Sequence, residues 1–348
     1  MRERESNYDL LRGLAAASVV LAHVSASFVE TFVWDYWDGI PGNHPLVSCV
    51  YTTLPRFSVP VFLMLSGAFL LGDERTGDFR SFYQKALKRV AVPAVIAIVF
   101  ACVYNFITLG LIDHAGMRAV FQPLLDGAPF YHLWYLPVML MSYLSAPFVY
   151  RFKDAVGESL FIKVSLVMTA LGSYALWQNS PVTMHWNIGE AFCMLGYFMA
   201  GYSLRALSKD KKGGWVLVSL GVILEIIAGW LLYKALLTGM DRTLAEHRYI
   251  MTYTPLITLA SLLIFAGFAR VRVRGDYRWF SEHTYEIYLI HAFVLDVILR
   301  VSRHLYGQRT LTHLDSRIAI PVIALIVYLV SYGIAVLIKK AKPRRASQ

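Results

Sequence analysis

The sequence of 348 residues is 57% hydrophobic and only 16% charged, and its mean hydropathy is +0.51. Because soluble globular chains carry about 25% charged residues, this composition excludes an ordinary soluble protein and indicates a polytopic membrane protein. The net charge of +10 does not indicate nucleic acid as a partner, since the basic residues lie in short joints between apolar runs and form no basic stripe.

Apolar runs of about 20 residues, the length that crosses a bilayer, follow one another along the chain. They predict one all-α bundle of about ten transmembrane helices, with residues 1–348 as a single domain, near 9–31, 46–70, 90–112, 132–150, 164–180, 189–206, 215–238, 250–269, 280–302 and 316–338. The first run has no small-residue cleavage site, so we expect an uncleaved span. The three cysteines lack metal-ligand spacing, and we expect no metal site.

Lysine and arginine predict the orientation, because they concentrate in cytoplasmic joints. With the N-terminus inside, 23 of them fall in inner segments and six in outer ones. This asymmetry predicts that both termini are cytoplasmic and that the number of spans is even. The basic tail from Lys339 is then cytoplasmic, and we expect it to contact anionic membrane lipid.

Titratable residues occur inside the first predicted span, where they are costly and usually functional. Arg12 and His23 are eleven residues apart, which in a helix is three turns plus about 20°, with a rise of roughly 16 Å. Both therefore share one face, and Asp9, three residues before Arg12, lies on the same stripe. His23 is a candidate general base, against the alternative of a packing histidine, and Arg12 could instead extend to lipid phosphates.

Arg56 lies near the middle of the second predicted span, too deep to reach the surface cheaply. A central arginine costs about 2.5 to 3.5 kcal/mol on insertion scales, so it should face a cavity or pair with an acid. Pro55 and Pro60 predict a kink with freed carbonyl groups beside it. Glu225, central in the seventh span, is a candidate counter-ion, and a purely structural ion pair is the alternative.

Three further segments carry polar chemistry. The inner joint before the third span places three cations within five positions, Lys85, Lys88 and Arg89, which also fits ordinary inner-side charge. An aromatic run typical of the outer interface includes Trp134. A polar stripe on the ninth span, which would line a cavity, comprises Ser281, Thr284, Tyr285, Tyr288 and His291. From these residues alone, an enzyme and a transporter of a lipid-linked or acidic solute remain equally open.

Four motifs occur in a fixed order along these spans. They are Leu11-Arg12-Gly13 with His23, then Arg56-Phe57-Ser58-Val59-Pro60-Val61-Phe62 leading to Ser66-Gly67, then Leu133-Trp134-Tyr135-Leu136, then Tyr285-Glu286-Ile287-Tyr288-Leu289-Ile290-His291. Together they resemble the acyltransferase 3 family of integral membrane acyltransferases, nearly end to end, and most closely the branch that acetylates surface-polysaccharide sugars. Where that family has an Arg-x-x-Arg pair, this chain has Lys85 and Lys88, which keep the charge but lose the planar fork.

The resemblance implies transfer of an acyl group, usually acetyl, from cytoplasmic acyl-coenzyme A to a hydroxyl of an envelope polysaccharide or lipid-linked sugar at the bacterial inner membrane. The expected catalytic residues are His23, Arg56 as an oxyanion donor with Tyr288 as the alternative donor, and Asp9. His23 acts either as the base in direct transfer or as the carrier of the acyl group. The residues expected to hold the coenzyme are Arg12, Lys85, Lys88, Arg89, Trp134, Tyr288 and His291, the cations through its phosphates. Acyl-coenzyme A is the donor and no permanently bound cofactor is expected. The sequence does not indicate an oligomeric state.

Overall fold

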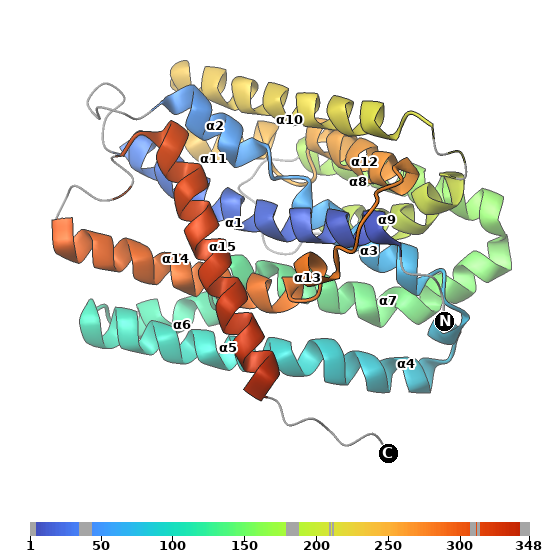
Figure 1. The fold of residues 1–348 in the computed structure, drawn as a ribbon, viewed down its shortest axis with the longest axis horizontal. Coiled ribbons are helices and arrows are strands. Elements are labelled where there is room, and N and C mark those ends of the chain that lie inside the picture. The colour runs from blue at the N-terminus through green and yellow to red at the C-terminus, as the bar shows by residue number, and fades with distance from the viewer. Residues whose placement is uncertain are drawn as a thin grey trace.

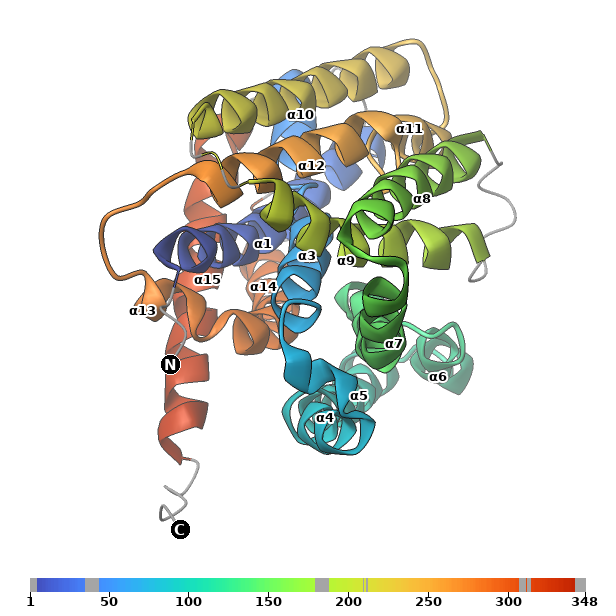
Figure 2. The same ribbon diagram turned by 90° about the vertical axis from the view of Figure 1, so that its right-hand side faces the viewer.

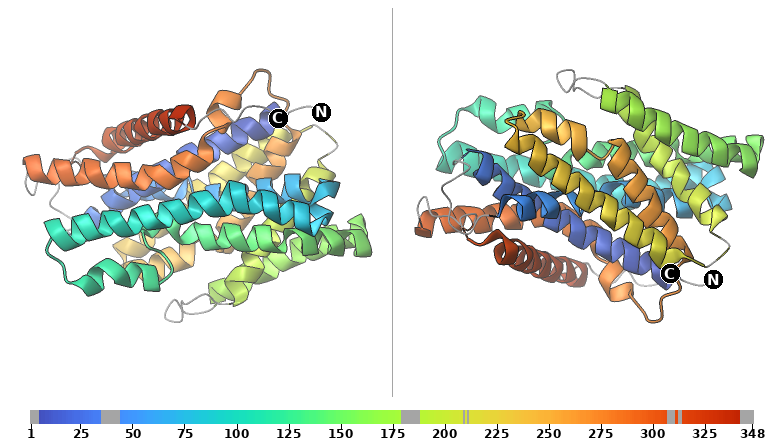
Figure 3. Two further views of the ribbon diagram at one scale, coloured as in Figure 1. Left: turned by 90° about the horizontal axis from the view of Figure 1, so that it is seen from below. Right: turned by 90° about the horizontal axis from the view of Figure 1, so that it is seen from above.

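The structure is a computed structural model that describes residues 5–34, 44–178, 188–208, 210, 212–306, 311 and 314–341. Every regular element in these residues is helical, which confirms the all-α class. The helices run side by side as one bundle (Figures 1 and 3). The lysine and arginine count predicts that both chain ends are cytoplasmic. Both ends lie outside the described residues.

The α-helices are α1 (Ser6–Trp34), α2 (Pro45–Thr53), α3 (Ser58–Leu70), α4 (Phe79–Ala86), α5 (Val92–Asn105), α6 (Met117–Leu125), α7 (Tyr135–Val156), α8 (Glu158–Gln178), α9 (Ile188–Leu207), α10 (Gly214–Leu237), α11 (Arg242–Tyr249), α12 (Pro255–Arg270), α13 (Arg278–Ser281), α14 (Thr284–Tyr306) and α15 (Ser316–Ala341). Short 3₁₀ turns form η1 (Glu74–Gly77) and η4 (Tyr131–Trp134), and π-helical turns form η2 (Leu87–Ala91) and η3 (Phe106–Ile112).

Seven segments of the described chain are long and apolar enough to cross a membrane, so this is a multi-pass membrane protein. They are Ser6–Val29, Pro45–Leu70, Phe79–Ile112, Tyr131–Val156, Glu158–Gln178, Gly214–Leu237 and Ser316–Ala341. The other three predicted spans are also helices, but α12 is shorter, α14 carries Asp296 and Arg300, and α9 is rich in small and polar residues. The count of ten therefore stays a prediction.

The centre of the bundle depends on a very close approach of α3 to α9. A Cβ atom added to Gly67 of α3 would overlap the carbonyl oxygen of Phe198, and one added to Gly201 of α9 would overlap the carbonyl of Met64. Small residues let membrane helices approach this closely. The van der Waals contacts of the close approach then hold the helices together, because lipid supplies no hydrophobic driving force between them. Figure 2 shows α3 and α9 in the middle, with α10 and α12 above and α7 below.

The second predicted span is broken into α2 and α3 at residues 54–57, which confirms the kink expected from the prolines. Pro55 has no N–H, so the carbonyl of Tyr51 has no donor within its own helix. That carbonyl instead accepts a hydrogen bond from Ser25 Oγ of α1 (3.2 Å), and the Thr52 carbonyl accepts from Arg56 Nε (3.1 Å). The break thus ties α2 to α1 and leaves Arg56 at a helix interruption.

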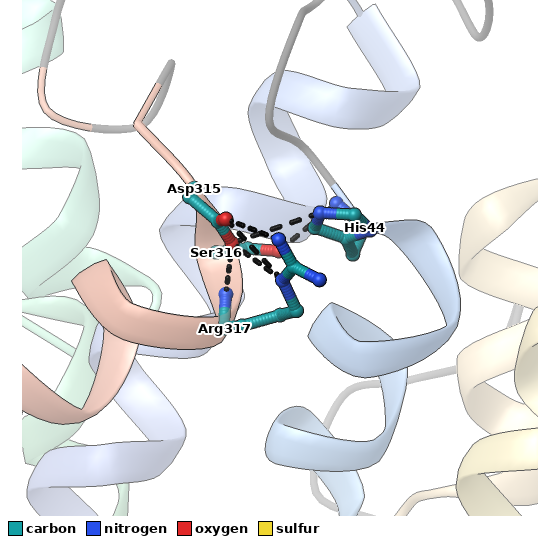
Figure 4. Close-up of polar contacts among 4 residues, drawn as sticks. All are labelled: His44, Asp315, Ser316 and Arg317. Carbon is teal, nitrogen blue, oxygen red and sulfur yellow. Dashed lines mark hydrogen bonds and ion pairs between the residues drawn. The ribbon is translucent and has the colours of Figure 1, made fainter.

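Polar contacts tie both ends of α15 to the rest of the bundle. At its start, Asp315 accepts hydrogen bonds from Nε and Nη2 of Arg317 and lies 3.7 Å from His44 Nε2 (Figure 4). Ser316 Oγ accepts a hydrogen bond from the His44 backbone N–H at 2.9 Å. At its end, Lys339 Nζ pairs with Glu282 at 3.0 Å. The Lys339 ammonium lowers the pKa of Glu282. These pairs join α15 to α2 and to the turn before α14.

We predict that Gly67→Ala destabilises the protein, because α3 and α9 must separate to admit the methyl group. Overpacking of this kind costs about 1 to 3 kcal/mol, which should appear as a lower melting temperature in detergent. Gly333→Ala in α15 is the matched control, since its Cβ meets nothing within 4 Å and alanine favours a helix by about 1 kcal/mol. Equal melting temperatures for the two variants would contradict the close approach of α3 and α9.

We predict a pH-dependent contribution from Asp315. Hydrogen bonds from Arg317 lower the pKa of the Asp315 carboxyl to about 2, below its unfolded value of about 3.9. The ionised carboxylate therefore stabilises the fold fully above about pH 4, and this stabilisation is lost as the pH falls towards 2. The melting-temperature gap between wild type and Asp315→Asn should stay constant near neutrality and close below about pH 4. A gap that persists into acid would contradict the assignment.

Candidate active site

Helix α1 carries Asp9, Arg12 and His23 in one uninterrupted helix, so the shared face expected from their spacing is present. Asp9 is buried, accepts a hydrogen bond from Ser281 Oγ at 2.9 Å, and lies 3.6 Å from Arg12 Nη1. The Arg12 guanidinium also lies 5.7 Å from the centre of the Phe69 ring. Asp9 and Phe69 thus fix the direction of Arg12, whose side chain stays 32% exposed.

A cavity of about 320 Å³ lies beside this arginine. Its walls come from five helical segments, α1, α3, η2, α7 and α14, and it is lined by Arg12, Phe62, Leu65, Ser66, Phe69, Leu70, Arg89, Val90, Tyr135, Met139, Tyr143, Thr284, Tyr285 and Tyr288. Two guanidinium groups, four tyrosines and an apolar wall are thereby brought together. Ligand pockets of about this size combine apolar walls with a few converging polar groups, which makes the cavity the best candidate for a coenzyme site.

The three predicted cations of the inner joint are not equivalent in the structure. Lys85 and Lys88 are exposed and do not line the cavity, whereas Arg89 does. The reason is local: Pro93 has no N–H to bond the carbonyl of Arg89 and its ring would clash with that carbonyl, so the helix widens into the π turn η2. This turn sets the direction of Arg89, which the sequence spacing alone could not give.

His23 belongs to a group of three histidine rings drawn from three elements. The centre of the His23 ring lies 5.2 Å from that of His291 on α14, and His291 lies 5.1 Å from His132 on η4. His23 is partly exposed, and its ring is also 5.1 Å from Tyr131, which is 48% exposed. His132 and His291 are 1% and 0% exposed. His23 is therefore the histidine of this group that an entering molecule can reach.

Tyr288 connects the cavity to this histidine group. It lines the cavity, its hydroxyl donates to the His132 carbonyl at 2.6 Å, and its ring lies 6.2 Å from His291. His23 itself is not among the residues that line the cavity. Because the Tyr288 hydroxyl is already committed to a backbone carbonyl, Tyr288 is placed to shape the cavity rather than to donate to a reacting oxygen.

Sequence reasoning missed His132, which it treated only as part of an aromatic interfacial run. The structure buries this ring between Tyr288, His291 and Phe293, with ring centres 5.1 to 5.6 Å apart. The signal that could have found it is that His132 directly precedes the Leu133-Trp134-Tyr135-Leu136 motif. A histidine that belonged only to the interfacial run would be exposed to water. Trp134, predicted to hold the coenzyme, is only partly buried and does not line the cavity.

Arg56 and Glu225 lie in the same region, as expected, but without a direct hydrogen bond. Arg56 is partly exposed and donates through Nε to the Thr52 carbonyl. Glu225 is 0% exposed, and its carboxyl group faces the Phe57 backbone N–H without a close side-chain hydrogen bond among the residues described. The charges of Glu225 and of Glu246 on α11 act on Arg56, and the charge of Arg56 acts on His23. Arg56 thus lies within electrostatic reach of two acidic residues and of the candidate base His23.

No group of three or more His, Cys, Asp or Glu side chains in the described ranges is arranged to hold a metal ion. The His291 ring lies tilted by 34° against His23 and edge-on to His132. What the arrangement offers is an imidazole that can exchange a proton, a nearby guanidinium, and a separate cavity bordered by two arginines. These are the parts that acid–base catalysis on a phosphate-bearing substrate requires.

No curated protein and no solved structure matches the chain. The sequence model described as an acyltransferase domain matches residues 5–339, nearly the whole chain. The protein is therefore a multi-pass membrane acyltransferase that belongs to the acyltransferase 3 family.

Proposed function

We propose that this protein is an O-acetyltransferase of the bacterial inner membrane, which moves acetyl from cytoplasmic acetyl-coenzyme A to a hydroxyl of an envelope polysaccharide or lipid-linked sugar. The observation that carries the proposal is α1, a single rigid helix that sets Arg12 at the cavity and His23 in the histidine group. Its rise of roughly 16 Å between the two residues is comparable with the arm between the phosphates and the sulfur of coenzyme A.

In this proposal Arg12 and Arg89 bind the coenzyme phosphates at the cavity, and Lys85 and Lys88 attract the anion from the surface. The arm lies along the apolar wall towards Tyr135 and Tyr288. His23 removes the proton of the acceptor hydroxyl as its oxygen attacks the thioester carbon. Arg56, whose charge acts on His23, stabilises the developing oxyanion. The family assignment favours this enzyme over the alternative of a transporter.

The proposal requires the Arg12 end of the bundle to face the cytoplasm. Reporter fusions after Gly72 and at Gln348 should both read cytoplasmic, because lysine and arginine are so strongly concentrated on that side. A periplasmic signal at either position would place the cavity on the wrong side for acetyl-coenzyme A.

The roles of Arg12 and His23 are tested with purified protein, acetyl-coenzyme A and an envelope extract, by following free coenzyme A and acetylated glycan. Arg12→Ala should raise KM for acetyl-coenzyme A by about 10- to 100-fold, because hydrogen bonds to charged groups contribute about 1.5 to 3 kcal/mol. His23→Ala should leave KM unchanged and lower kcat by about 10²- to 10⁴-fold. Full transfer by His23→Ala would remove His23 as the base, and no release of coenzyme A by wild type would overturn the acetyl donor.

Arg56 is tested by replacement with lysine, which keeps the charge but not the planar fork. If the guanidinium stabilises the oxyanion, Arg56→Lys should lower kcat by about 10²-fold or more while the protein still inserts and purifies. Glu225→Gln is the companion variant, since it removes a buried carboxyl group that touches no reacting atom. Normal turnover by Arg56→Lys, or loss of folded protein in both variants, would assign Arg56 to a structural ion pair instead.

A further inference from the structure

The tautomer of His291 is fixed by its own helix. Its Nδ1 atom lies 2.8 Å from the Tyr288 carbonyl oxygen and 3.1 Å from that of Ile287. A carbonyl oxygen can only accept, so Nδ1 carries the hydrogen and Nε2 carries a lone pair. This Nε2 is buried and has no hydrogen-bond partner in the described chain. His291 is therefore a buried acceptor that lacks a donor.

Three rings surround this acceptor, and two of them have no hydrogen to offer. His132 Nε2 lies 3.4 Å from the Leu289 carbonyl, which places its hydrogen there and leaves a lone pair on the unpartnered Nδ1. The Tyr288 hydroxyl donates to the His132 carbonyl. The remaining ring is His23, 5.2 Å away and tilted by 34°. Two imidazoles joined by a nitrogen-to-nitrogen hydrogen bond have centres roughly 5 Å apart.

We propose that His291 is a positioning residue: its free Nε2 accepts a hydrogen bond from one ring nitrogen of His23 when the His23 ring turns towards it in the working site, which directs the lone pair of the other nitrogen into the open space. This inference rests on the proposed function, in which His23 is the base. Because His291 cannot offer a hydrogen at Nε2, it selects the His23 tautomer whose basic nitrogen faces away from His291, towards the open space. The carboxylate of a catalytic triad orients its histidine by the same logic.

The proton balance of the reaction gives His291 a second use. As the acceptor oxygen forms its bond to the carbonyl carbon, the hydroxyl proton passes to His23. The carbon–sulfur bond then breaks, and the thiolate takes that proton from His23. Between these steps His23 is an imidazolium with two N–H groups in a site of low dielectric, where an unpaired donor is expensive. His291 Nε2 accepts one of them throughout, so the charged intermediate is not left unsatisfied.

The first test needs no substrate. Diethyl pyrocarbonate acylates the unprotonated nitrogen of a neutral imidazole, and peptide mass spectrometry reports the reaction at His23 alone. We expect His23 to react readily in the wild type, several-fold more slowly in His291→Leu, and at close to the original rate in His291→Gln, whose amide oxygen can again accept. An unchanged rate in His291→Leu would overturn the proposal, whatever the activity of the enzyme.

The second test separates binding from chemistry. His291→Leu should lower kcat by about 10²-fold, the scale of a base that is lost or misdirected, with KM for acetyl-coenzyme A unchanged, and His291→Gln should recover most of kcat. His283→Leu is the matched control, because His283 is equally buried and also has an unpartnered Nδ1, but its ring lies against Tyr332. Equal losses in the three variants, or an inactive His291→Gln, would make the role of His291 structural.

The two tests distinguish this inference from the proposed function. If His23→Ala retains transfer, His23 is not the base. The diethyl pyrocarbonate reaction would then report only that His291 sets the tautomer of His23, without a role in catalysis. If His23→Ala is inactive but neither carbethoxylation nor kcat responds to His291→Leu, His23 remains the base and the inference about His291 fails alone.

Discussion

Lipid offers no hydrogen bonds, so the polar side chains of a membrane bundle must find their partners within the protein. This constraint sets how the helices of this bundle meet. The Tyr197 hydroxyl on α9 contacts Thr258 Oγ1 and the Thr252 carbonyl at 2.7 and 2.6 Å, which joins α9 to α12. Ser25 bonds the carbonyl that Pro55 leaves without a donor, which joins α1 to α2. Each such pair fixes the register of one helix against another.

Two of the exceptions to this rule lie side by side. His132 and His291 each keep an unpartnered buried ring nitrogen, and His291 lies next to His23; other unpartnered atoms of the described chain, such as His283 Nδ1, lie elsewhere. A catalytic site needs groups that the fold has not used, since a committed donor or acceptor cannot serve a substrate. Asp9 shows the opposite case, because it is partnered by Ser281 and Arg12, and we expect it to act by placing Arg12.

The long helix α1 links the two halves of the proposed mechanism. Arg12 borders the cavity, while His23 lies about three turns further along beside the exposed ring of Tyr131. Under the proposed function, the coenzyme and the sugar approach His23 from different directions, and Tyr288 and His291 lie between the cavity and the base. Such separation keeps the thioester away from bulk water until an acceptor hydroxyl is present.

The sequence by itself determined the all-helical class, the approximate positions of the long apolar helices, the break beside Arg56 and the shared face of Arg12 and His23. These follow from local rules, because apolar length, proline chemistry and helical period act within one segment. Only the tertiary structure decided that Arg89 lines the cavity while Lys85 and Lys88 do not. It also decided that the Tyr288 hydroxyl donates to a backbone carbonyl, and that His132 lies in one group with His23 and His291. These facts depend on how distant segments pack. A sequence pattern describes one segment at a time, so it does not predict which acceptor atoms remain without a donor once the helices have packed together.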